Sequence, residues 1–242
     1  MTLPARSKGD GGAESAPAAP DDVTSGVAGN ERLTAVAGTV LLILIVVEIL
    51  TIPALRALMT VHVLVGVLLA GPLIVKLGSA GYRFARYCGG SPAYVRRGPP
   101  RLQLRLLAPL LVVLTIVLIA SGIALTVIGP ANPGPFLAMH NVTFLAWLPV
   151  ISIHVVAYAS RAIRLVTAES SESPSIPPGR TWRLMTNGVA LLLGALGAAI
   201  LLPDAPPWDA WIQVSQAVPA PLIAGSVLTL VVLLIARPGR WA

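Results

Sequence analysis

Three histidines and one glutamate are the residues of this chain whose types and positions could support chemistry. His62, His140 and His154 each lie within a long apolar run, and Glu48 is the only carboxylate inside such a run. A neutral imidazole can bind a transition metal or carry a proton near neutral pH. Ionisable side chains in apolar segments are costly, so they commonly mark functional sites. These four residues are therefore the candidate functional residues.

The composition is that of an integral membrane protein. Of the 242 residues, 55% are hydrophobic and 11% are charged, whereas soluble domains carry about 25% charged residues. Six apolar runs have about the 20 residues that a helix needs to cross the hydrocarbon, where the backbone must satisfy its own hydrogen bonds. They cover residues 34–55, 58–77, 105–129, 137–160, 184–203 and 217–236. We therefore expect an all-α integral membrane protein with six transmembrane helices.

These runs divide the chain into four parts. Residues 1–33 are rich in Gly, Ala, Pro, Ser and acidic residues, a composition that predicts a disordered cytoplasmic tail. The first four apolar runs, within residues 34–165, are expected to form a four-helix bundle. Residues 166–183 are expected to be a cytoplasmic linker, and residues 184–242 a C-terminal transmembrane hairpin.

The distribution of basic residues predicts the orientation in the membrane. The stretch from Lys76 to Arg105 holds seven of the seventeen basic residues and no acidic residue. Basic loops stay in the cytoplasm, so both termini are expected there, in a multi-pass protein of the plasma (inner) membrane. The net charge of +7 thus reflects topology and contact with lipid, not binding of nucleic acid. Trp208 and Trp211 are expected in an aromatic belt at the outer surface.

The orientation places two histidines at the same depth. His62 and His140 each lie about one turn from the outer end of a helix that runs inwards. His154 follows His140 by fourteen residues, which places it ~21 Å deeper and only about 40° away around the helix. One imidazole from each of two neighbouring helices is what a b-type haem requires, because its iron takes one axial ligand from either side. Gly66, one turn after His62, would leave room for the porphyrin ring.

These histidines and the topology resemble those of membrane cytochrome b subunits of the b561, nickel–iron hydrogenase and formate dehydrogenase type. The resemblance covers mainly residues 34–165, and it implies that histidines of the bundle hold one or two haems. A second haem would need a histidine fourteen residues after His62, where this chain has Lys76. We therefore expect one haem b, with His62 and His140 as its iron ligands. His154 is then a relic, a single axial ligand, or a hydrogen-bond partner of Ser121 or Asn187.

Glu48 has functional and structural interpretations, and a stripe of small residues indicates helix packing. Glu48 could orient a histidine through a hydrogen bond or accept a proton from a quinol. It could equally be a protonated buried carboxyl group, or one that reaches towards Arg56. Ala190, Gly194 and Ala198 form a small-xxx-small stripe that is typical of close helix packing.

Two classes of function follow from this pattern. The first is a membrane b-type cytochrome that relays electrons between a quinone or cytoplasmic donor and an acceptor on the outer side. Such a protein is at most the electron-transfer subunit of an oxidoreductase, with a redox protein or quinone as its partner. The second is a cofactor-free multi-pass protein, either a small transporter or an assembly or accessory subunit. The sequence contains no phosphate-binding loop, Cys/His metal cluster or nucleophile elbow.

Overall fold

The computed structural model of the chain describes residues 20–96, 98, 102–170, 179–214 and 220–236, and this part is helical with no strand. The main helices are α1 (Pro20–Thr51), α2 (Leu55–Leu68), α3 (Ala70–Cys88), α5 (Leu102–Ile128), α6 (Gly134–Ser170), α7 (Arg180–Leu201), α8 (Pro206–Val214) and α9 (Ala220–Ala236). The shorter elements are η1 (Ile52–Ala54), α4 (Pro92–Val95) and η2 (Leu202–Asp204). The prediction of an all-α protein is confirmed.

The described helices have the length and surface of membrane-spanning segments. Four helical stretches are long and apolar enough to cross a membrane; they are Gly26–Cys88, Leu104–Ile128, Gly134–Thr167 and Arg180–Asp204. The first of them contains the turn at η1, after which α3 packs back against α1. Large apolar side chains cover the exterior, and Ile74 and Leu192 are 72% and 67% exposed. An exterior of this kind suits lipid rather than water.

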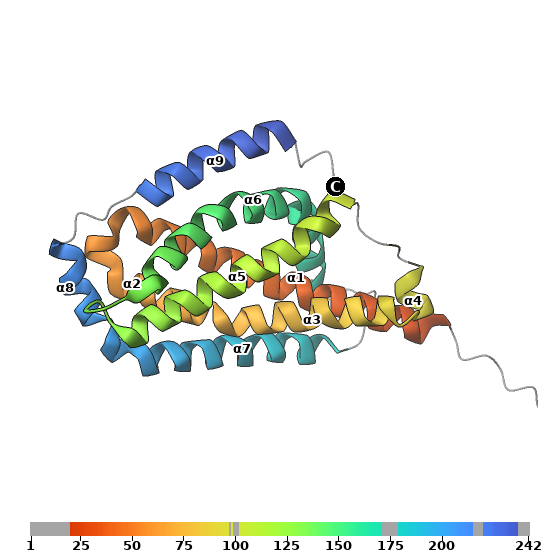
Figure 1. Ribbon diagram of the computed structural model, residues 1–242. Coiled ribbons are helices and arrows are strands. Elements are labelled where there is room, and N and C mark those ends of the chain that lie inside the picture. Colours follow the sequence, from red (N-terminus) through yellow and green to blue (C-terminus); the bar gives the residue numbers. More distant parts are fainter. Residues whose placement is uncertain (1–19, 97, 99–101, 171–178, 215–219, 237–242) are drawn as a thin grey trace, which may run out of the picture.

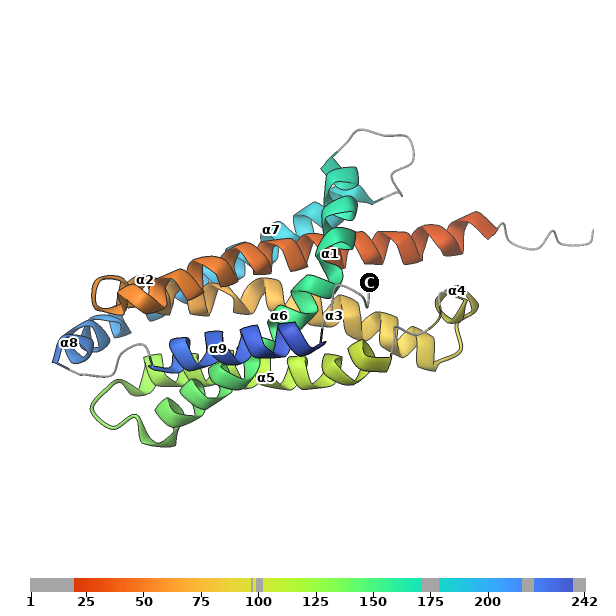
Figure 2. The same cartoon turned by 90° about the horizontal axis from the view of Figure 1, so that it is seen from above.

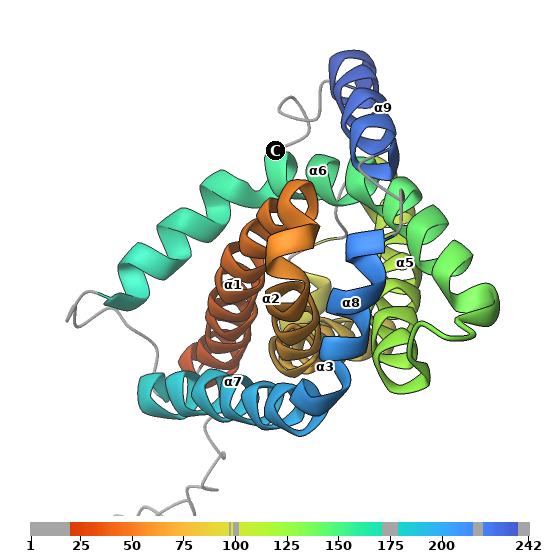
Figure 3. The same ribbon diagram turned by 90° about the vertical axis from the view of Figure 1, so that its left-hand side faces the viewer.

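Four helical segments surround a central space. Helix α1 contacts α3 and α6, α6 contacts α5, and α5 contacts α2, so the ring closes (Figures 1 and 2). Helix α8 lies across one end of this ring (Figure 3). The predicted bundle within residues 34–165 thus has a counterpart in α1, α2–α3, α5 and α6.

The two long helices within residues 184–242, predicted as a transmembrane hairpin, pack against different neighbours. Helix α7 packs against α1, α2 and α3, whereas α9 packs against α6 (Figure 3). The small residues of α7 explain its position, since Ala190, Gly194 and Ala198 are buried and face α2 and α3. A Cβ atom at Gly194 would lie only 2.5 Å from the carbonyl oxygen of Leu68. The small-residue stripe therefore determines which helices α7 contacts, and the prediction of close packing is confirmed.

Two predicted segment boundaries differ from the structure. Residues 20–33, expected to belong to a disordered tail, form the beginning of α1, and residues 1–19 lie outside the described part. Polar packing accounts for the extra turns, because the Asn30 amide donates to the Ser79 carbonyl at 3.1 Å. The predicted linker 166–183 is also shorter, since α6 continues to Ser170 and α7 begins at Arg180.

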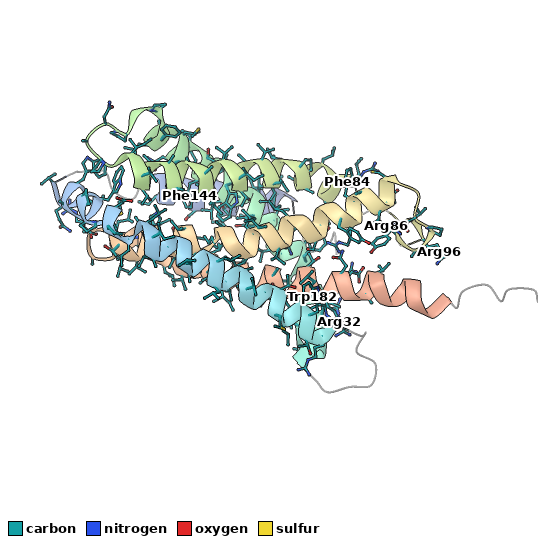
Figure 4. The ribbon with its side chains drawn as sticks, turned by 90° about the horizontal axis from the view of Figure 1, so that it is seen from below. Arg32, Phe84, Arg86, Arg96, Phe144 and Trp182 are labelled. Carbon is teal, nitrogen blue, oxygen red and sulfur yellow. The ribbon has the colours of Figure 1, made fainter. Side chains whose placement is uncertain are left out.

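Arginines gather at the end of the molecule opposite α8. Figure 4 shows Arg32, Arg86 and Arg96 in the half that holds α4, whereas Phe144 lies in the half that holds α8. We call these two parts the basic end and the α8 end. The charge asymmetry that the sequence predicts along the loops is therefore an asymmetry between two ends of the folded bundle.

Candidate cofactor-binding site

The centre of the bundle contains a cavity of about 660 Å³. Helices α1, α2, α3, α5 and α6 line its sides, and Trp208, Trp211 and Ile212 of α8 close one end. Most of the lining is aliphatic; the polar side chains in it are those of Glu48, His62, Lys76, Thr115, Thr126, His140, Asn141 and His154. Sites for cofactors and small molecules are commonly apolar cavities of about 300–1,000 Å³ with a few polar groups. This cavity is therefore the candidate site.

His62 and His140 face each other in this cavity. Their ring centres are 6.5 Å apart and their ring planes are nearly perpendicular, at 87°. An imidazole nitrogen lies about 2.0–2.1 Å from a bound zinc ion and about 1.15 Å from its own ring centre, so two imidazoles on opposite sides of one metal have centres roughly 6.4 Å apart. The structure thus brings together the two histidines that the sequence paired, with a separation between ring centres that suits one metal ion between them.

The Nδ1 atom of His62 is held by two oxygen atoms of α1. It lies 2.9 Å from Thr51 Oγ1 and 3.1 Å from Glu48 Oε1. The Thr51 hydroxyl donates its own hydrogen to the Glu48 carbonyl oxygen at 2.6 Å, so towards His62 it can only accept. This arrangement favours the tautomer of His62 with its proton on Nδ1, which leaves the lone pair of Nε2 available.

The Nδ1 atom of His140 is held in the same way by α5. It lies 3.1 Å from the carbonyl oxygen of Leu118 and 3.1 Å from Ser121 Oγ. A carbonyl oxygen only accepts hydrogen bonds, so Nδ1 of His140 also carries the proton. Gly122 permits this approach, because a Cβ atom there would lie 3.1 Å from Cε1 of the ring. Ser121 thus contacts His140, not His154 as one interpretation of the sequence had it.

Both histidines have the arrangement that metal-binding histidines show. Such a histidine donates its second ring N–H to a carboxylate, a carbonyl or water, which fixes the tautomer and the ring orientation. Among the described residues, no group of three or more His, Cys, Asp or Glu side chains could hold a metal ion by itself. A metal between His62 and His140 would need further ligands, which water or a cofactor such as a porphyrin could supply.

Glu48 lies directly behind His62, where the sequence suggested a supporting role. Its Oε1 contacts the ring, and its Oε2 is buried with no hydrogen-bond partner in the described part of the chain. Gly66 makes room for this carboxyl group, since a Cβ atom at Gly66 would lie 3.2 Å from Oε1. Gly66 also lines the cavity, so it serves the site by admitting Glu48 beside His62.

His154 and Lys76 also line the cavity, away from the paired histidines. The Lys76 ammonium group donates to the Thr34 carbonyl at 3.1 Å and would touch a Cβ atom at Gly38. The ring of His154 stacks at a tilt near Tyr158, with 4.8 Å between ring centres. Asn187, the other suggested partner of His154, instead donates to the Arg183 carbonyl at 2.9 Å. No second pair of imidazoles can form here, because the chain has only three histidines.

Several residues of the site were not recognised from the sequence. Thr51, Leu118, Ser121 and Gly122 orient the histidines through contacts that depend on the register between helices. Trp208, expected in an aromatic belt at the outer surface, is only 3% exposed, and its indole N–H donates to the Leu125 carbonyl at 3.1 Å. The proline-containing turn at η2 precedes α8, which lies across the end of the bundle and lines the cavity (Figure 3).

Comparison with known proteins adds no relative from which a function could be transferred. No protein-family model matches the chain, and neither a curated protein nor a solved structure shows significant similarity to it. The fold and the site define the chain as a helical membrane protein with a central cavity lined by three histidines, two of which face each other.

Proposed function

We propose that this protein is a membrane b-type cytochrome in which His62 and His140 bind one haem b. The separation of 6.5 Å between the two ring centres carries this proposal. The hydrogen bonds at both Nδ1 atoms support it, because they leave both Nε2 atoms available for iron. The apolar cavity supports it as well, since burial and the surroundings of the axial ligands tune a haem.

Each part of the cavity has a separate task in this proposal. The haem supplies a reversible one-electron iron couple when it is bound. Thr51 and Glu48 hold His62, while Leu118 and Ser121 hold His140, so that both rings keep their orientation. The indoles of Trp208 and Trp211 cover the α8 end and keep water out of the cavity. The aliphatic lining would surround the porphyrin with apolar side chains.

The proposed place of the protein is the plasma membrane, with six transmembrane helices and both termini in the cytoplasm. The antiparallel packing of α1 and α3 supports two crossings within the first long helical stretch. The gathering of arginines at the basic end supports its cytoplasmic location. In this orientation the haem lies near the outer surface. The protein would pass electrons from a quinone or a cytoplasmic donor to an outer acceptor.

The absorption spectrum of the purified protein tests the proposal. Protein made in haem-replete cells should be red and should show a Soret band that shifts when dithionite reduces the iron. A colourless preparation that also fails to bind added haemin would contradict a cytochrome. It would favour the cofactor-free transporter or accessory subunit, for which the cavity would serve another ligand.

The proposed topology predicts which thiols a membrane-impermeant reagent can reach in intact cells. With Cys88 replaced by serine, Ala131→Cys should be labelled from outside, because Ala131 is exposed in the loop between α5 and α6. The wild-type protein is the matched control. Its exposed Cys88 should be labelled only after lysis, since it lies at the basic end of α3. The opposite pattern would reverse the orientation.

Replacing Glu48 should weaken haem binding without preventing it. Glu48→Leu removes an acceptor that lies 3.1 Å from His62 Nδ1, and loss of such a partner commonly lowers affinity about ten- to hundred-fold. Haem titration of the apoprotein measures this change. Glu48→Gln keeps an oxygen at the same place and should bind haem more tightly than Glu48→Leu. Equal affinities of the two variants would show that Glu48 does not orient the ligand.

A further inference from the structure

A second cavity lies outside the bundle core, between α1 and α6. It has a volume of about 590 Å³ and is lined by Ala28, Glu31, Arg32, Arg161, Arg164 and Leu165. We call it the arginine pocket. Each helix supplies its residues at positions i, i+3 and i+4, so each presents one face to the pocket. We propose that the arginine pocket binds the phosphate group of an anionic phospholipid.

The charge of the pocket suits a phosphate. Three arginines face one glutamate, which gives a formal charge of three minus one, or +2. Arg161 Nη2 pairs with Glu31 Oε1 at 3.0 Å, and this ion pair fixes one guanidinium group at the wall. Arg164 is exposed, and its guanidinium group makes no hydrogen bond or ion pair to a described residue. A guanidinium group has five N–H donors in a fork that matches phosphate oxygens.

The position of the pocket favours a lipid as the source of the phosphate. Glu31 of the pocket precedes Glu48, the residue that contacts His62, by 17 residues on α1, which is ~26 Å along the helix axis and close to the thickness of the hydrocarbon. The pocket therefore lies at the membrane boundary on the side opposite to the paired histidines. On α6, Val156 and Ile163 are 45% and 63% exposed and would lie beside acyl chains. Basic pockets between transmembrane helices on the cytoplasmic side are known to hold anionic headgroups.

Lipid-dependent stability of the full-length protein in detergent tests this inference, and it does so whether or not haem is bound. Phosphatidylglycerol should raise the unfolding temperature of the wild-type protein in a saturable way. Phosphatidylcholine, whose headgroup has no net charge, and inorganic phosphate should not raise it. If inorganic phosphate stabilises the protein as well as phosphatidylglycerol does, the ligand is a soluble phosphate compound and the lipid proposal fails.

Substitution of Arg164 tests whether phosphatidylglycerol acts at the arginine pocket. In Arg164→Gln, the phosphatidylglycerol concentration that gives half of the maximal rise in unfolding temperature should increase about tenfold, since the substitution removes charge-assisted hydrogen bonds. Arg164→Lys keeps the positive charge but lacks the forked N–H donors of a guanidinium group, so it should increase this concentration by less. Arg105→Gln is the control, because Arg105 is an exposed arginine outside the pocket. If Arg164→Gln responds to the lipid as the wild type does, or if Arg105→Gln loses as much, the pocket is not the site.

Discussion

His62→Ala and His140→Ala should each abolish the low-spin haem spectrum of the purified protein. A six-coordinate iron with two imidazole ligands needs both rings, and these are the two rings whose centres lie 6.5 Å apart in the cavity. The loss should be nearly complete in either variant, because no other histidine can replace the missing one at that level. Absorption spectra of the reduced and oxidised protein measure the effect.

His154→Ala is the matched control within the same cavity. It also removes a cavity-lining imidazole, but this ring lies near Tyr158 and is not one of the facing pair. The low-spin spectrum should therefore be largely retained. A colourless His154→Ala variant together with a red His140→Ala variant would show that the wrong histidines were paired.

Exogenous imidazole separates loss of a ligand from loss of the fold. His140→Gly leaves a space beside Gly122 that free imidazole can fill. If His140 is an axial ligand, added imidazole should restore the low-spin spectrum of this variant. A variant that binds haem normally without imidazole would remove His140 from the site.

The sequence predicted the helices and the pairing of the histidines for identifiable reasons. Run length indicates which segments are helical, and the positions of basic residues indicate direction. Together these gave His62 and His140 the same depth. Periodicity within one helix also indicated that the face carrying Gly194 packs closely. Run length, charge and periodicity can each be recognised within a single segment of the sequence.

The contacts between helices could not be predicted in the same way. The identity of the atoms that hold Nδ1 depends on how α1 and α5 are rotated against α2 and α6. A shift of one residue would replace Thr51 or Leu118 by another group. The position of Trp208 depends on the turn at η2, which directs α8 across the cavity. The separation of α7 from α9 similarly depends on which neighbour offers a matching groove.

The contact between α7 and α2–α3 leads to the second large effect, a loss of stability from a single methyl group. A Cβ atom at Gly194 would lie 2.5 Å from the Leu68 carbonyl oxygen, and one at Gly71 would overlap the Ala190 carbonyl oxygen. Both clashes are with backbone atoms, which cannot turn away as a side chain could. The helices must therefore separate, and overpacking of this kind costs about 1–3 kcal/mol.

Gly194→Ala and Gly71→Ala should thus lower the unfolding temperature of the protein in detergent, with the larger decrease for Gly71→Ala. Gly188→Ala is the matched control, because Gly188 lies on the same helix as Gly194 and a Cβ atom there meets nothing within 4 Å. Exchanging Gly for Ala inside a helix is otherwise favourable by about 0.5–1 kcal/mol, so this control should unfold at the same temperature as the wild type or above it. The two α7 variants therefore carry the same chemical change, and only Gly194→Ala should lower the unfolding temperature. If Gly194→Ala is as stable as Gly188→Ala, α7 does not pack against the backbone of α2, and the small-residue stripe has another role.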